Sequence, residues 1–460
     1  LYTTEEVNTV LKEFASHDIT HESQLPIFEQ TIVTYTINNI PVETLDAYER
    51  PLFDQYQSLR ATVYGSDQTV TYLYQIYILS DYSPKHNYKI ELNNIDLDTM
   101  TRETFQQGLI NVYQEDEFIL PIGQNINVRH RGNSSWANHE KKPFRIEFDS
   151  DVEMMGLRPH DTYYLLSIHA DKSLMRDVLA HQLAKMLNIE TTQETRYVDL
   201  YINNEYHGLY LLIEDRRYIQ IDETSEALAF ALELDFRAEW EQYVDETWFY
   251  SNGIPYVLKR PSLSTEDDIV GIQLYLDDLV DALENGDLDE NEIDIQNWAS
   301  YFFIQEYFKN VDAWGLSTFL YKEANEPLKF GPVWDFDLSI GNADYVNDAY
   351  YSPEGYWFTT HPMAIWAQLT LRFEAFSDVY ENIIRTFYVN TYQTWLMMIE
   401  TLGIALIPYA EKNFERWDIL DVYIWPNPDR LLTNTYYEQV TFVKNFLEDR
   451  LLWLLEETYE

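Results

Sequence analysis

The sequence lacks cysteine altogether and is poor in glycine, proline and basic residues. Without cysteine, disulfides, thiolate zinc sites, iron–sulfur ligation and cysteine nucleophiles are excluded. Only 14 Gly and 16 Pro occur among 460 residues, which excludes a collagen-like or low-complexity chain. Because 46% of the residues are hydrophobic and 16% are aromatic, the chain can fill sizeable cores, and its length predicts two or three folded units.

Charge is strongly one-sided, with 31 Lys and Arg against 78 Asp and Glu and a net charge of −47. Such a surface repels nucleic acid and anionic membranes, so we expect no nucleic-acid partner, and it attracts metal cations and basic polypeptides. The longest apolar stretch, residues 395–410, contains Glu400 and Pro408, so no membrane span is expected. The sequence starts at Leu1 without a basic, apolar leader, and we therefore expect that a signal peptide has been removed.

Periodicity divides the chain into a strand-rich first half and a helix-rich second half. We expect an accessory extension over residues 1–86, with a helix over 3–14 and strands over 31–37 and 69–79. Residues 87–214 predict an antiparallel sheet with one helix, N-capped by Asp171 and ending at Asn188, and a hairpin turn at Asn203-Asn204. Residues 215–460 predict helices over 269–283, 298–308, 379–402 and 437–457, with a β-rich insert over 319–338. The expected fold class is α+β with a cleft between two lobes.

A cluster of basic residues is the least expected feature of so acidic a chain. Five of the 31 basic residues fall in one 17-residue window, opposed only by Glu140: Arg129, Arg131, Lys141, Lys142 and Arg145. The window contains the run Arg131-Gly132-Asn133-Ser134-Ser135-Trp136, whose glycine and short polar side chains are typical of a phosphate-binding loop. Strand alternation puts Lys142 on the face of Phe144, Ile146 and Phe148, so it is expected to point inward. The alternative is that these cations form salt bridges to the acidic remainder.

Two acidic positions complement the basic window. In Trp334-Asp335-Phe336-Asp337-Leu338, strand alternation puts Asp335 and Asp337 on one face, where paired carboxylates favour a cation such as Mg²⁺ between them. Asp312 lies upstream of this pair, across a predicted hairpin. Protein kinases have the same order of catalytic Asp, short β pair and metal-binding Asp.

Five motifs follow one another along the chain: the run from Arg131 to Trp136, Lys141-Lys142-Pro143-Phe144-Arg145-Ile146, Asp171-Lys172-Ser173-Leu174-Met175-Arg176, the run Val198 to Glu214 around Tyr206-His207-Gly208-Leu209-Tyr210, and Trp334-Asp335-Phe336-Asp337. Together they resemble the spore coat protein H (CotH) kinase family, in the family's order, over residues 88–342. The resemblance implies an atypical protein-kinase-like fold with a strand-rich N-lobe and a mainly helical C-lobe. It also implies a secreted, surface or spore-coat enzyme that uses ATP and Mg²⁺, or Mn²⁺, to phosphorylate Ser or Thr of proteins.

The resemblance also implies roles for individual residues. Asp312 becomes the catalytic Asp, Asp335 the magnesium ligand and Asp337 a second ligand. Lys142 is expected to contact the α- and β-phosphates, the loop containing Arg131, Gly132, Asn133 and Ser134 to cover the phosphates, and Glu214 to begin the hinge near the adenine. The acidic surface predicts acceptor hydroxyls near Lys or Arg.

Two departures from the kinase pattern keep alternatives open. Ser317 occupies the position where kinases place an Asn that binds a second metal, so Ser317 becomes the candidate ligand there, although a hydroxyl is a weaker magnesium ligand. The predicted helix after Lys172 has no Glu to pair with Lys142, so Asp177 or another acid would replace it. One alternative is therefore a non-catalytic coat or envelope protein that binds nucleotide or partners. A second is a glycoside hydrolase in which Asp312 and Asp335 act as the acid and base, although neutral sugars need no cluster of cations.

Overall fold

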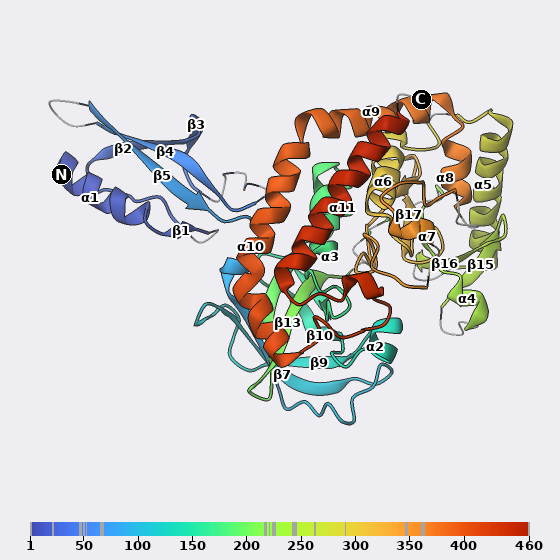
Figure 1. Cartoon of the computed structure of the whole chain (residues 1–460), viewed down its shortest axis with the longest axis horizontal. Helices are drawn as coiled ribbons and strands as arrows, with labels where there is room; N and C mark the ends of the chain where they lie inside the picture. The colour runs from blue at the N-terminus through green and yellow to red at the C-terminus, as the bar shows by residue number, and fades with distance from the viewer. Residues whose placement is uncertain are drawn as a thin grey trace.

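The structure, a computed structural model, describes residues 2–458 apart from residues 21–22, 46–47, 49–50, 52, 65–68, 216–218, 220, 223–226, 242–245, 262–263, 290, 346–347 and 360–363. A small N-terminal unit lies at one end of the molecule (Figure 1). It consists of α1 (Thr4–Phe14) and a sheet of order β1-β5-β4-β2-β3. Its strands are β1 (Asp18–Ile19), β2 (Ile32–Ile37), β3 (Ile40–Val42), β4 (Gln55–Tyr64) and β5 (Thr69–Ile78). The helix and the two strands predicted here are confirmed.

This N-terminal unit has a core of its own. Val7 and Leu11 of α1 pack against alternate residues of β4 and β5, including Leu59 and Ile76. Thr3 caps the helix by accepting the N–H of Glu6. None of the predicted site residues lies in this part of the chain.

The second unit is an eight-stranded sheet that closes on itself. The strand order is β6-β12-β13-β11-β10-β9-β7-β8, and β6 also pairs with β7. The elements are η1 (Pro84–His86), β6 (Tyr88–Asn93), β7 (Gln106–Gln114), β8 (Glu117–Phe118), β9 (Gln124–His130), α2 (Ser134–Asn138), β10 (Phe144–Val152), β11 (His160–Leu166), α3 (Arg176–Met186), β12 (Thr195–Ile202) and β13 (Glu205–Glu214). The predicted antiparallel sheet is thus mixed, because β6 and β12 run parallel and complete the closure.

Helix α3 begins later than the sequence predicted. Asp171 is not its N-cap but lies in the preceding loop, where it accepts the N–H of Ser173 and that of Arg176, the first residue of the helix. Asn188 has the predicted left-handed backbone just beyond the helix, at φ +58°. The Asn203-Asn204 hairpin is also confirmed, with both residues at positive φ.

The second half holds most of the helices and a third sheet. Its strands, in the order β15-β16-β14-β17-β18, are β14 (Phe230–Leu234), β15 (Trp248–Ser251), β16 (Ile254–Arg260), β17 (Thr318–Lys322) and β18 (Lys329–Phe330). Its helices are α4 (Arg237–Trp240), α5 (Glu266–Asn285), α6 (Ile295–Phe308), α7 (Asp348–Tyr351), α8 (Ile365–Thr370), α9 (Glu374–Asn390), α10 (Tyr392–Arg416) and α11 (Tyr436–Glu457). The predicted β-rich insert is confirmed at β17 and β18, but the sequence missed the sheet around it.

The single helix predicted over residues 379–402 was wrong, because the chain breaks between α9 and α10 at Thr391. Helix α6 packs against α3, α9 and α11, and it is therefore buried over nearly its whole length. No helix in the described part of the chain combines the length and the apolar character needed to cross a bilayer.

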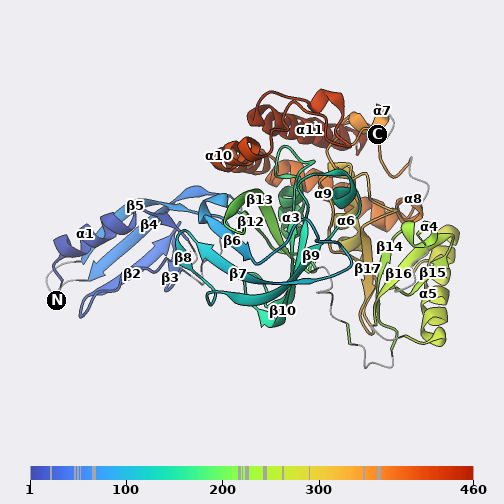
Figure 2. The same cartoon turned by 90° about the horizontal axis from the view of Figure 1, so that it is seen from below.

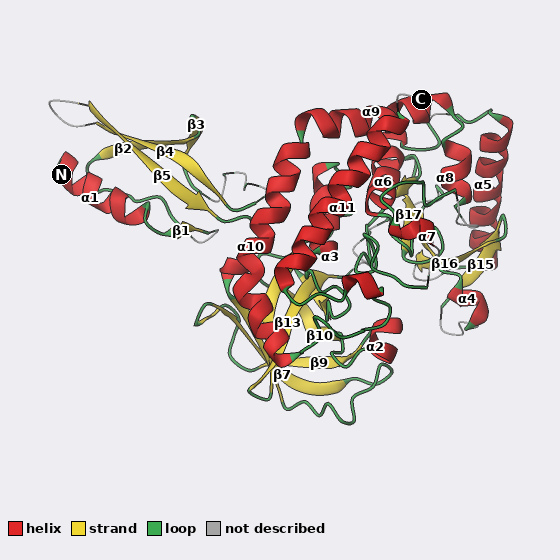
Figure 3. Ribbon diagram, viewed as in Figure 1, coloured by secondary structure: helices red, strands yellow, loops and turns green. Residues whose placement is uncertain are grey.

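The closed sheet lies between the N-terminal unit and the third sheet with α5, as Figure 2 shows from below. Figure 3, coloured by secondary structure, shows the two long helices α10 and α11 side by side, and α10 contacts β13 of the closed sheet. Helix α3 shares one core with α6 and with Tyr197 and Leu211 of the closed sheet. The strand-rich and helical parts are therefore joined through α3, which adjoins the predicted site.

Candidate active site

Residues 331–342 form a loop, not the strand that alternating apolar and acidic residues predicted. β18 ends at Phe330, and Asp335 has a left-handed backbone with φ +64°. Trp334 packs against Tyr164, and Phe336 packs against Phe308, with ring centroids 6.0 and 5.5 Å apart. The alternation therefore reflects two separate anchoring contacts and not the pleat of a strand.

Helix α3 and the loop before it hold this acidic loop in place. The Phe336 N–H donates to Asp177 Oδ1 at 2.8 Å, and Arg176 Nε donates to the Ser339 carbonyl at 2.9 Å. Both Asp177 and Arg176 are buried. The backbone on either side of Asp337 is thus fixed by the motif that begins at Asp171.

Asp312 lies in the connection between α6 and β17, where the sequence predicted it. Its carbonyl accepts the N–H of Leu316 at 2.9 Å, and its side chain is half-buried. Five residues further on, Ser317 has φ +48°, and its Oγ donates to Asp335 Oδ2 at 3.2 Å. Ser317 and Asp335, predicted separately as metal ligands, are therefore direct neighbours.

The acidic side chains act on one another electrostatically. Burial and the negative charge of Asp335 raise the pKa of Asp312 to about 7, against the opposing charge of Arg237. Burial, followed by the charges of Asp335, Asp177 and Asp312, raises the pKa of Asp337 well above its usual range. We call Asp177, Asp312, Asp335 and Asp337 the carboxylate cluster.

The predicted phosphate loop turns sharply at Gly132. Its φ is +81°, and a Cβ there would lie 2.4 Å from Ser135 Oγ, so a side chain would collide within the loop. Arg102 steadies the loop by donating to the Gly132 carbonyl at 3.0 Å and to Asn133 Oδ1 at 2.7 Å. From Ser134 onward the chain forms the single turn of α2, which the sequence analysis treated as loop.

Arg131 brings this basic loop to the carboxylate cluster. Its guanidinium lies 4.6 Å from the ring centroid of Tyr164 and 5.5 Å from that of Trp334. Its positive charge also lowers the pKa of Asp177, partly offsetting the effect of burial on that carboxyl. The basic and acidic motifs, predicted about 200 positions apart in the sequence, thus meet at the Arg131 side chain.

The lysine that points inward is Lys141, whereas the sequence predicted Lys142. Lys141 is fully buried and donates to the Leu209 carbonyl and to Asn413 Oδ1, and burial lowers its pKa well below the usual range. Lys142 is half-buried and donates to the Trp136 carbonyl at the end of the phosphate loop. The alternation failed because β10 begins only at Phe144, so the pleat does not extend to Lys142.

Two other basic residues of the window lie on paired strands of the closed sheet. Arg129 and Arg145 face each other across β9 and β10 and lie over Phe105, and Arg145 pairs with Glu147. The salt-bridge alternative describes Arg145 correctly. Arg131 and Lys142 are the members of the basic window that border the Gly132 loop.

Glu214 is the last residue of β13 and is buried. Its carboxylate accepts the N–H groups of Arg158 at 2.7 Å and Glu194 at 3.2 Å, and it forms an ion pair with Arg158 Nε at 3.4 Å. Burial raises its pKa above the usual range. Its predicted place in a hinge near adenine stays a prediction.

The oxygen atoms of the cluster suit Mg²⁺ only when a bound phosphate compound supplies further oxygen ligands to the same ion. Among the described residues, no three carboxylate or imidazole groups are close enough to bind a metal ion without other ligands. Asp335, Asp337 and Ser317 offer hard oxygen donors, and Mg²⁺ is usually held by one or two carboxylates together with phosphates and water. The residues present therefore fit a metal that arrives with a phosphate ligand.

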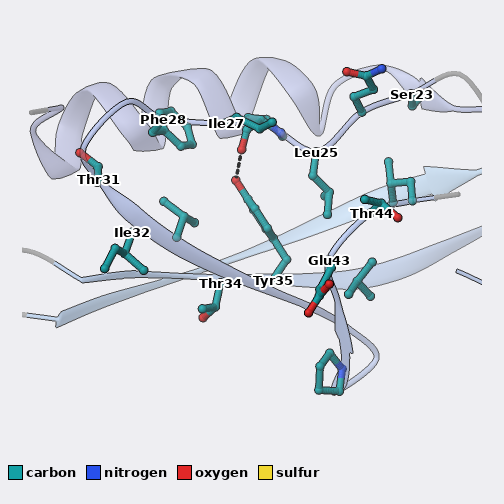
Figure 4. A pocket seen from close by; sticks show the side chains of 16 residues that line it. Ser23, Leu25, Ile27, Phe28, Thr31, Ile32, Thr34, Tyr35, Glu43 and Thr44 are labelled. Carbon is teal, nitrogen blue, oxygen red and sulfur yellow. Dashed lines mark hydrogen bonds between the residues drawn. The ribbon is translucent and has the colours of Figure 1, made fainter. Parts of the chain in front are cut away.

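A well-formed hollow of about 740 Å³ lies far from this chemistry, in the N-terminal unit. Figure 4 shows it between β2 and the segment containing Leu25 and Phe28, where the Tyr35 hydroxyl donates to the Pro26 carbonyl. Its lining is mainly apolar, and Glu43 is the charged residue in it. It contains no residue of the predicted site.

Sequence reasoning missed several residues beside the cluster. Asp235 and Arg237 form an ion pair at 2.8 Å and act on Asp312, and Tyr345 has its pKa raised by burial and then by Asp312. Arg102 lies some thirty residues before the loop that it supports. No local pattern distinguishes these residues, because only the packing of distant segments brings them to the site.

Comparison with known proteins gives one result that covers most of the chain. A family model described as CotH kinase protein matches residues 128–454, a range that includes every predicted site residue. It leaves out the N-terminal unit and the first strands of the closed sheet. No curated protein matches the chain significantly.

Proposed function

The chain belongs to the CotH kinase family, and on that premise we propose that it transfers the γ-phosphoryl group of ATP to Ser or Thr hydroxyls of protein acceptors, with Mg²⁺ or Mn²⁺. One observation carries the proposal: Arg131, from the basic loop, lies against Trp334 next to Asp335. A triphosphate needs cations along its phosphates and carboxylates for its metal ion, and this contact supports a single site for both. The closed sheet and the helical half would serve as the two lobes of a kinase-like fold.

The residues of the cluster have distinct parts in this reaction. Asp312 would orient the acceptor hydroxyl and take its proton as the new P–O bond forms and the bond between the γ-phosphorus and the ADP oxygen breaks. A pKa raised to about 7 suits a base that works near neutral pH. Asp335 and Asp337, with Ser317 beside them, would hold the metal ion, which offsets phosphate charge when bound. Arg131, Lys142 and the backbone from Gly132 to Ser134 would fix the phosphates in line.

The likeness to the family also supports a location outside the cytoplasm, at the cell surface or in a spore coat. The acidic chain supports acceptors whose hydroxyls lie near Lys or Arg. Ser317 favours a second candidate, a non-catalytic member that binds nucleotide or partners. A hydroxyl that donates to Asp335 is a weaker metal ligand than the amide oxygen found at this position in kinases.

Transfer of label from γ-labelled ATP to a Lys-rich protein acceptor tests the proposal. The full chain is incubated with Mg²⁺, with EDTA, and as the variants Asp335→Ala and Asp116→Ala; Asp116 is an exposed acid on the turn between β7 and β8. We expect labelling by the wild type and by Asp116→Ala, and a loss of at least about 100-fold in Asp335→Ala and in EDTA. Nucleotide binding without label transfer would instead support the non-catalytic candidate. Equal labelling by Asp335→Ala would refute the metal role.

A further inference from the structure

Asp177 stands at the junction between α3 and the acidic loop. It lies in the first turn of α3 and is buried. Behind it, the fully buried Arg176 pairs with Asp171 and contacts the Ser339 carbonyl, so the start of the helix is firmly held. A carboxylate at this point is close to the positive end of the helix dipole, which tolerates negative charge.

The carboxylate of Asp177 is directed at the backbone next to Asp335. Its Oδ1 accepts the N–H of Phe336 at 2.8 Å, one residue after Asp335. Asp335 has φ +64°, a conformation that costs a non-glycine residue energy and persists only when its surroundings enforce it. The hydrogen bond to Phe336 fixes the peptide group that follows this strained residue.

Two further contacts determine where the Asp335 side chain points. The Phe336 ring is buried against Phe308, and Ser317 Oγ donates to Asp335 Oδ2 at 3.2 Å. With the backbone held by Asp177 and one carboxylate oxygen held by Ser317, Asp335 has little freedom to turn. Partners of this kind, which do not touch a metal themselves, commonly change metal affinity by about 10- to 100-fold.

The hydrogen bond to the Phe336 N–H needs an acceptor at position 177 but not a negative charge. The site is buried, it faces the charges of Asp335 and Asp171, and these effects raise the pKa of Asp177 to about 7 in spite of Arg131. A neutral acceptor would make the same hydrogen bond without like-charge repulsion. Among the described contacts, Asp177 does not form the ion pair with Lys142 that the kinase pattern predicted. The Lys142 ammonium donates instead to the Trp136 carbonyl.

We propose that Asp177 is a positioning residue that orients Asp335 for metal binding by accepting the Phe336 N–H. This inference rests on the proposed function, in which Asp335 holds the metal ion beside the phosphates. It predicts that metal affinity depends on a hydrogen-bond acceptor at position 177 and not on the negative charge there.

Binding of Mn²⁺ to the full chain, measured by electron paramagnetic resonance in the presence of a non-hydrolysable ATP analogue, tests this without catalysis. Asp177→Asn keeps an acceptor oxygen, whereas Asp177→Ala and Asp177→Leu lack one, and the leucine fills the space that alanine leaves. We expect the apparent Kd for Mn²⁺ to rise about 10- to 100-fold in the Ala and Leu variants and to stay within about threefold of wild type in Asp177→Asn. Asp116→Ala should bind as the wild type does.

Thermal unfolding of each variant separates loss of folding from loss of metal affinity. Affinity in a folded Ala or Leu variant equal to that of the wild type would overturn the inference, and so would an Asn variant as weak as Ala. If the wild type bound no Mn²⁺ with the analogue, the proposed function would fail together with this inference. A wild type that binds Mn²⁺ alongside unaffected Asp177 variants would remove the role of Asp177 alone.

Discussion

At the scale of single residues, the carboxylate cluster is the feature that the fold tolerates at a cost. Asp312 and Asp337 are half-buried, and both have raised pKa values. They lie near the buried Asp177 and the exposed Asp335. Arg131 and Arg237 act against this effect, on Asp177 and Asp312 respectively. A group of neighbouring carboxyls whose pKa values are raised is more typical of a functional site than of a structural ion pair.

The raised pKa of Asp312 predicts how stability changes with pH. A carboxyl whose pKa is about 7 in the folded chain and 3.8 in the unfolded chain keeps its proton in the folded state between those values. The free energy of unfolding should therefore fall as the pH rises from 4 to about 7, and stay low above that. Because Asp312 is half-buried, solvent weakens the electrostatic cost of its charge, and we expect Asp312→Asn to remove about 2 kcal/mol of this fall in the free energy of unfolding.

Urea unfolding at pH 5 and pH 8, in EDTA, measures that difference. Asp116→Asn is the matched control, because it removes one carboxylate from an exposed turn. It should lose as much stability between the two pH values as the wild type does. A fall in Asp312→Asn as large as in the wild type would show that Asp312 does not cause it.

At the scale of elements, sequence patterns succeeded where contacts are local. The helices at residues 4–14 and 436–457 and the Asn203-Asn204 hairpin follow from capping residues, periodicity and turn chemistry. Patterns failed where distant contacts decide. The acidic residues around Asp335 alternate like a strand, but Trp334 and Phe336 are held by different parts of the chain.

The inward lysine illustrates the same limit. Both Lys141 and Lys142 precede β10, and only the position of Asn413 on α10 and of the Leu209 carbonyl selects Lys141 for burial. Gly208 is part of this contact. Its φ is +119°, and a Cβ there would lie 2.8 Å from Lys141 Cε and 2.9 Å from Trp417 Nε1.

We therefore expect Gly208→Ala to destabilise the protein by about 2–3 kcal/mol, through backbone strain and crowding of Lys141. Gly253→Ala is the matched control, because Gly253 also has positive φ, at +75°, but no atom lies within 4 Å of its added Cβ. That control should lose only about 1 kcal/mol. Urea unfolding of both variants checks this, and equal losses would mean that packing around Gly208 is not tight.

At the scale of the whole molecule, the sequence indicated the mixed α and β class of the fold and named the residues of a candidate site, but it did not show how those residues are brought together. Arg131, Asp177, Asp312 and Asp335 come from four separate segments, and α3 joins them by packing between the closed sheet and α6. The sequence did not predict that β6 and β7 pair and close that sheet, and it did not predict the five-stranded third sheet. Both depend on pairings between strands far apart in the sequence, which local periodicity does not reveal.

The charge of the whole chain leads to a prediction about acceptors. With a net charge of −47, the protein attracts a basic peptide over distances longer than any single contact. If it phosphorylates proteins, kcat/KM should be higher for a Ser peptide flanked by Lys than for one flanked by Glu. Because salt shortens the range of these forces, raising the salt from about 20 mM to about 300 mM should lower kcat/KM for the Lys peptide by about tenfold or more.

A neutral Ser peptide, measured in parallel, should change little, because long-range attraction contributes nothing to its encounter with the protein. Equal rates for the Lys and Glu peptides at low salt would show that acceptor choice depends on contacts at the site and not on the field of the chain.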